Sequence, residues 1–141
     1  QSAISRLSEI IKSSDFQDER LAATMSLGFI GNSKSIPLLN SLLDDDEPNI
    51  RWDAAIGLAK MGEDSSIPII QNLMDRNYLS TFPELDQNEV TKVILTAIET
   101  TTIIVDQRFE PLLETLASSD ENLKVRNAAI KTLKFAYNKK T

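Results

Sequence analysis

The stretch RLAATMSLGFIG, residues 20–31, returns as RWDAAIGLAKMG at residues 51–62. Both copies begin with Arg and place Ala three positions on, Leu seven on and Gly eleven on. Three pairs of landmarks share one offset of 31 residues: Arg20 and Arg51, Gly31 and Gly62, and Pro37 and Pro68. A repeat of this length is typical of helical pairs that stack into an array.

Proline recurs at the head of short apolar runs, in PLLNSL at Pro37, PIIQNL at Pro68 and PLLETL at Pro111. A first-turn proline followed by helical apolar spacing predicts the first helix of each pair, which we name the A helix. The second, or B, helices lie between them, and Gly31 and Gly62 stand where a left-handed cap ends a helix. We expect A helices over about 4–13, 34–44, 65–75 and 107–118, and B helices over about 17–30, 48–61, 88–104 and 122–137.

Composition excludes several classes of site. The 141 residues suit one domain and carry a net charge of −6, which opposes nucleic-acid binding. Cys and His are both absent, so thiol nucleophiles, disulfides and Cys or His zinc sites are excluded. No apolar run approaches the roughly 20 residues of a membrane span. We therefore expect no catalytic residue, no metal, no cofactor and no membrane span.

Each helical pair carries an apolar stripe that it cannot bury alone, which predicts an α-solenoid. We expect an all-α fold of about four stacked hairpins, in one domain over 1–141 with repeats at about 1–31, 32–62, 63–105 and 106–141. The residues NIRWDAAIGLAKMGEDSSIPII and ERLAATMSLGFIGNSKSIPLL resemble the short HEAT-like repeats found in phycobilisome lyases. That resemblance implies a right-handed superhelix whose B helices line the concave face. The chain starts without Met or an apolar leader, so we expect a fragment of a longer protein.

The third repeat departs from the pattern. Thr91 stands where Arg is expected, and about nine extra residues fall within RNYLSTFPELD at 76–86. The aromatic Tyr78 and Phe82 of this insertion either meet a partner or fold back on the third helical pair. The B helix at 88–104 is rich in β-branched residues and is assigned as helical from the repeat alone. In the fourth repeat, Tyr137 replaces the closing glycine.

An acidic residue lies five positions before the arginine position near the start of each B helix, which we call the ladder position. In HEAT-like repeats, such Asp and Arg residues resemble the rungs of a structural ladder that ties adjacent turns and helices together. The acidic residues five positions before the ladder position are Asp15, Asp46, Asp86 and Glu121, and the arginines are Arg20, Arg51 and Arg126. The alternative role, in which these arginines bind an anion or act in catalysis, also stays open.

The B helices carry a ridge that we assign to partner binding. Trp52 lies about 200° around its helix from the packed Ile50, so the indole is expected to face solvent or a partner. The same ridge includes Ile56 and Lys60, and its counterpart in the first copy is Leu21, Met25 and Phe29. In the alternative interpretation, Met25, Phe29 and Ile56 fill the seam between neighbouring B helices, and Trp52 has a structural role.

The function favoured by these observations is a non-catalytic protein-interaction or scaffold module that binds an unknown protein or peptide on its B-helix face. The alternatives are an enzyme or chromophore-handling protein of the phycobilisome lyase kind, and nucleic-acid binding, for which the basic last helix offers the cations. We expect a monomer or weak self-association. The compartment stays open between cytoplasm, which is slightly favoured, and export.

Overall fold

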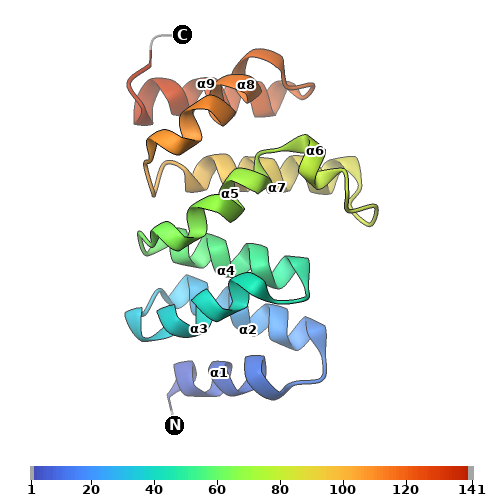
Figure 1. Cartoon of the computed structure of the whole chain (residues 1–141), viewed down its shortest axis with the longest axis vertical. Coiled ribbons are helices and arrows are strands. Elements are labelled where there is room, and N and C mark those ends of the chain that lie inside the picture. Colours follow the sequence, from blue (N-terminus) through green and yellow to red (C-terminus); the bar gives the residue numbers. More distant parts are fainter. Residues whose placement is uncertain (1, 140–141) are drawn as a thin grey trace. The chain divides into compact units, whose positions relative to one another are not determined.

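The computed structural model describes residues 2–139, and within them every regular element is a helix and no strand occurs. The chain divides into two compact units, residues 1–69 and 70–141. Helical hairpins stack within each unit, as the predicted all-α solenoid requires (Figure 1). The division into four repeats and the handedness of a superhelix stay predictions.

The first unit contains two hairpins, α1 (Ala3–Ser13) with α2 (Gln17–Ile30) and α3 (Ile36–Ser41) with α4 (Pro48–Lys60). Short 3₁₀ turns flank α3 and follow α4: η1 (Ser33–Ser35), η2 (Leu42–Asp44) and η3 (Asp64–Ser66). Helix α2 packs against both α1 and α4, and α3 packs against α4. The core is aliphatic, with Ile11, Leu27, Leu39, Ile50 and Leu58 among its buried members.

Both predicted glycine caps are confirmed. Gly31 ends α2 with a φ of 67°, and its N–H donates to the carbonyl of Leu27. Gly62 follows α4 with a φ of 79°. Only glycine adopts this left-handed conformation without a steric penalty from Cβ, so the two residues let the chain turn into the next hairpin.

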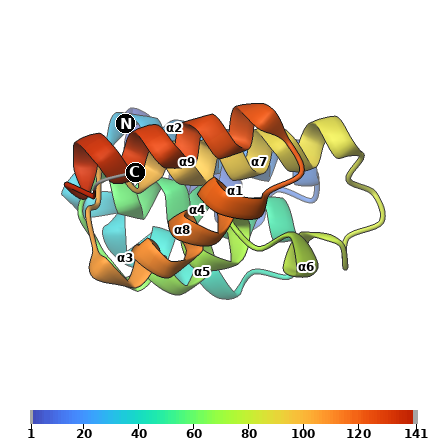
Figure 2. The ribbon, with the colours of Figure 1, turned by 90° about the horizontal axis from the view of Figure 1, so that it is seen from above.

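The second unit contains α6 (Arg76–Leu79), α7 (Gln87–Thr100), the 3₁₀ turn η4 (Gln107–Phe109), α8 (Glu110–Ser119) and α9 (Leu123–Ala136), and α5 (Ile67–Leu73) enters it from the first. Helix α9 packs against α7 and α8. Seen from above, α7 and α9 run side by side on one side of the unit, opposite α8 (Figure 2).

All eight predicted helices are present, but the ends of four of them differ. The A helices expected at 34–44, 65–75 and 107–118 are shortened by 3₁₀ turns, and the one at 65–75 is followed by the separate helix α6. Helix α7 ends at Thr100 rather than at 104. The hydroxyls of Thr101 and Thr102 donate to the carbonyls of Ile98 and Glu99, which favours turns over a further helical turn.

Tyr137 stands at the position of the closing glycine and holds the end of α9 through hydrogen bonds of its side chain. Its hydroxyl donates to the carbonyl of Thr101 at 2.9 Å and accepts from the N–H of Asp106 at 3.3 Å. The next residue, Asn138, adopts the left-handed conformation with a φ of 55°. The end of α9 is thereby tied to the end of α7.

Candidate protein-interaction surface

Helices α2 and α4 cross at two glycines, which places their axes unusually close together. A Cβ built on Gly57 would lie 2.7 Å from the Cα of Gly28, and one built on Gly28 would lie 3.0 Å from the Cα of Gly57. No side chain fits there, because the atom it would meet is backbone. Sequence analysis missed this pair, although a glycine inside a helix costs about 1 kcal/mol relative to alanine and so points to a packing role.

The outer face of α2 presents an apolar stripe to solvent. Ala22, Met25 and Phe29 are all exposed, and 87% of Phe29 and 56% of Met25 are accessible. Their spacing of three and four residues places them on one face of the helix. We call these three residues the α2 stripe. Leu21, also predicted on this ridge, is half-buried beside it.

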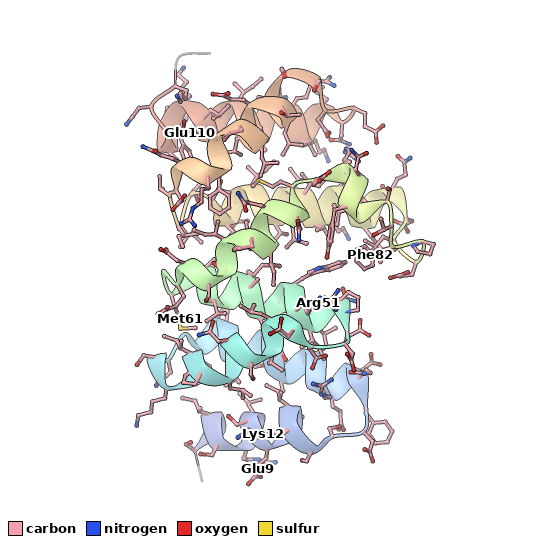
Figure 3. All side chains as sticks on the ribbon, in the orientation of Figure 1. Glu9, Lys12, Arg51, Met61, Phe82 and Glu110 are labelled. Atoms are coloured by element: carbon pink, nitrogen blue, oxygen red, sulfur yellow. The ribbon has the colours of Figure 1, made fainter. Side chains whose placement is uncertain are left out.

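The predicted exposure of Trp52 is wrong, because only 4% of this residue is accessible. The expectation assumed that α4 buries one stripe. Instead its buried residues extend well beyond one stripe: Ile50, Trp52, Ala54, Ala55, Gly57, Leu58 and Ala59. Trp52 is therefore a buried structural residue rather than an exposed anchor, while Ile56 is half-buried and Lys60 is exposed. Figure 3 shows Arg51 near the start of this helix and Met61 just after its end.

Asp53 on α4 is a half-buried carboxyl that sequence analysis did not single out. Burial raises the pKa of Asp53 to about 6, and the positive charge of Lys60 opposes part of that shift. The backbone carbonyl of Asp53 lies beside Gly28, next to the close crossing of α2 and α4.

The structural ladder is present in the first unit, but one residue away from the predicted position. Arg20 donates to Asp45 at 2.6 and 3.4 Å and to the carbonyl of Ile11 at 2.9 Å. The hydrogen bond from Arg20 lowers the pKa of Asp45 below its usual range. Arg51 donates to the carbonyl of Asp45 at 2.8 Å, whereas predicted Asp46 contributes only a carbonyl at 3.4 Å. Asp45 thus links the two arginines of successive B helices.

In the second unit the ladder arginine comes from the insertion. Arg76 of α6 donates to both oxygens of Asp120, at 2.6 and 2.9 Å. Burial of Asp120 raises its pKa, but the bonds from Arg76 and from the N–H of Asn122 outweigh burial and leave the pKa lowered. Arg126 donates to the carbonyl of Asp120 at 2.6 Å. Predicted Glu121 instead pairs with Arg76 at 3.1 Å, near the surface.

The two remaining predicted ladder acids, Asp86 and Asp15, do not pair with a ladder arginine within residues 2–139. Asp86 is the N-cap of α7 and forms a capping box with Glu89, which fits the presence of Thr91 where an arginine was expected. Asp15 is exposed. The place predicted for Asp15 is taken by Ser14, whose hydroxyl accepts from the N–H of Phe16 as Asp45 does from the N–H of Glu47. The turn therefore selects the residue six positions before the arginine, not five.

The aromatic residues of the insertion pack against each other. The rings of Tyr78 and Phe82 meet edge to face with centroids 5.2 Å apart, and both residues are half-buried. Phe82 lies on the loop between α6 and α7 (Figure 3). Their role in partner binding stays a prediction.

The described residues contain no group of three or more acidic side chains placed to hold a metal ion. None of the helices within 2–139 is long and apolar enough to cross a membrane. No curated protein is significantly similar to this chain. The family model for HEAT repeats matches residues 4–81, which include α1 to α6. Since that match covers more than half of the 141 residues, the chain belongs to the HEAT-repeat family.

Proposed function

We propose that this chain is a non-catalytic scaffold module that binds an apolar segment of a partner protein on the α2 stripe. HEAT repeats generally mediate protein–protein interaction, and proteins built from them are typically non-catalytic scaffolds. The observation that carries the proposal is the exposure of two large apolar side chains, Met25 and Phe29, one helical turn apart. Exposed apolar side chains gathered on one face are typical of protein-binding surfaces.

The energetics of the α2 stripe suit a partner of moderate affinity. Fully burying a Met or Phe side chain contributes about 1.5–3 kcal/mol, so the two residues together supply a few kcal/mol of apolar burial. Helix α2 is held against α1 and α4 before any partner arrives, which limits the conformational entropy lost on binding. Trp52 takes no part as an exposed anchor, and Leu21, Ile56 and Lys60 stay candidate neighbours of the contact.

Site-specific photo-crosslinking in the native host tests the proposal. A photoreactive phenylalanine analogue replaces Phe29, and a matched control places the same analogue at Thr115, an exposed position of α8. We expect a discrete protein adduct from position 29, with at least a fivefold lower yield when Met25→Ser is added. An equal adduct from position 115, or none from position 29, contradicts the proposal.

A further inference from the structure

A surface hollow of about 510 Å³ lies between the N-terminal halves of α7 and α9. Its walls include Lys92 and Leu95 from α7, and Leu123 and Lys124 from α9. Asn88, Thr91 and Asn122 supply its remaining polar lining. Leu123 is 61% exposed, although the helix on which it lies packs its opposite face into the unit. The hollow thus combines two ammonium groups with two leucines.

A second hollow of about 380 Å³ lies at the other end of the same helix. Lys131, Thr132, Phe135 and Ala136 of α9 line it, together with Thr102, which follows α7. Phe135 is 70% exposed, and the ammonium group of Lys134 lies 5.4 Å from the centre of its ring. An apolar group next to lysine therefore recurs at both ends of α9.

The charge of this face is one-sided. Helix α9 contains no acidic residue, and its exposed Lys124 and Lys131 form no ion pair within 2–139, nor does Lys92 of α7. The acidic residues nearby in sequence are engaged or outside the lining. Glu89 accepts from the N–H of Asp86, Glu121 pairs with Arg76, and Glu99 is an exposed residue of α7 that lines neither hollow.

The two hollows and the lysines beside them, Lys92, Lys124 and Lys131, form what we call the α7–α9 face. We propose that this face binds an acidic, extended peptide segment that carries two apolar side chains, one for each hollow. From Leu123 to Phe135 the rise along α9 is roughly 18 Å, at about 1.5 Å per residue. An extended chain covers that distance in five to six residues, at roughly 3.3 Å each. Side chains on the same side of an extended chain are an even number of positions apart, so the two apolar residues of the ligand are about six positions apart, and the acidic residues between them meet Lys124 and Lys131. This face and the α2 stripe share no residue.

The composition of the face favours a peptide over a nucleic acid or a lipid surface. Single-stranded nucleic acids are held by several stacking aromatics along a cationic groove, whereas these hollows contain one aromatic residue and two leucines. A short acidic peptide needs only the local lysines and two apolar contacts.

Fluorescence anisotropy with the full 141-residue chain tests this site. The probe is a labelled peptide of about twelve residues, rich in Asp and Glu, with two leucines six positions apart. We expect saturable binding that weakens with added salt. The double variant Lys92→Glu with Lys124→Glu should weaken binding at least tenfold, and Leu123→Ser at least threefold. The matched control, Lys12→Glu with Lys34→Glu, changes two exposed lysines of the first unit and should change binding less than twofold.

Thermal unfolding of each variant checks that the fold is kept, and Lys92→Gln with Lys124→Gln gives a milder change that should weaken binding by an intermediate factor. Absence of saturable binding, or equal losses in the control variant, overturns the proposal. Tighter binding of oligo-dT or of phosphatidylserine vesicles than of the acidic peptide also overturns it. None of these outcomes bears on crosslinking from Phe29, so the two proposals fail separately.

Discussion

Helices α2 and α4 share a sequence pattern, yet one presents an apolar stripe to solvent and the other is buried over a much larger part of its surface. The offset of 31 residues pairs Leu21 with Trp52, Met25 with Ile56 and Phe29 with Lys60. At each pair the α4 residue is more buried or more polar than its α2 counterpart. Both helices therefore leave the same face least buried, but the residues on that face are exposed and apolar in α2 and are half-buried or charged in α4. The differences between the two copies can be tested residue by residue.

The largest effect is expected at Trp52. Trp52→Ala removes a side chain that is 4% exposed, and truncating a buried Trp costs about 3–5 kcal/mol of unfolding free energy. The counterpart Leu21→Ala, at a half-buried position of α2, should cost about 1–2 kcal/mol. Urea unfolding followed by circular dichroism measures both. Equal losses in the two variants would remove the proposed difference between the helices.

The second expected effect concerns the close crossing of α2 and α4. Gly57→Ala places a Cβ 2.7 Å from the Cα of Gly28, so the helices must separate, and overpacking of this kind costs about 1–3 kcal/mol. The counterpart of Gly57 in α2 is Ser26, where Ser26→Ala is the matched control and should change stability by less than about 0.5 kcal/mol. If Gly57→Ala made the protein more stable, as helix propensity alone predicts, the result would contradict the close crossing of α2 and α4.

The third difference is electrostatic, because the counterpart of the exposed Ala22 is the half-buried Asp53. The pKa of Asp53 is raised to about 6, whereas an unfolded Asp titrates near 3.9. The folded state therefore holds its proton more tightly, and stability falls as the pH rises from about 4 to about 6, then stays level.

Asp53→Asn removes this ionisation, so we expect the variant to be more stable than the native chain at pH 7, by about 1 kcal/mol after allowing for the partial exposure of the side chain. The advantage should disappear below about pH 4, where the carboxyl of Asp53 is protonated in both the folded and the unfolded chain. Thermal unfolding between pH 3 and pH 8 measures the difference. If the difference in stability between the two proteins were constant across that range, Asp53 would have the same pKa in the folded and the unfolded chain.

The sequence predicted the helices well because their signals are local. Proline at the start of the A helices and Gly31 and Gly62 after the B helices act within one turn of the chain. The predicted ladder acid, Asp46, is one residue away from the acid that the structure uses. The run of acidic residues at 44–47 offers four candidates, and only the geometry of the turn selects Asp45.

The remaining differences depend on contacts that are distant in sequence. The third repeat has Thr91 where an arginine was expected, and Arg76 takes the place of that arginine beside Asp120. This requires the insertion to fold beside Asp120, and the spacing of residues in the sequence does not predict such a fold. The burial of Trp52 depends on how many neighbours surround α4, whereas an amphipathic pattern reports only one face. Gly28 and Gly57 did carry a usable signal, since both fall inside predicted helices where glycine is unfavourable.

The smallest effect on stability is expected at Phe29, the residue that most distinguishes the two copies. Phe29→Lys gives α2 the residue that α4 has at the corresponding position 60, and since Phe29 is 87% exposed the unfolding free energy should change by less than about 0.5 kcal/mol. Partner capture through the α2 stripe should nevertheless fall at least fivefold, because a charged ammonium group must be desolvated where a phenyl ring was buried. Urea unfolding measures the stability of the variant. The yield of partner adduct measures capture, with the photoreactive phenylalanine analogue placed at position 25 instead of position 29. A loss of stability comparable to that of Leu21→Ala would instead make Phe29 part of the packing between helices, as the alternative interpretation of the ridge requires.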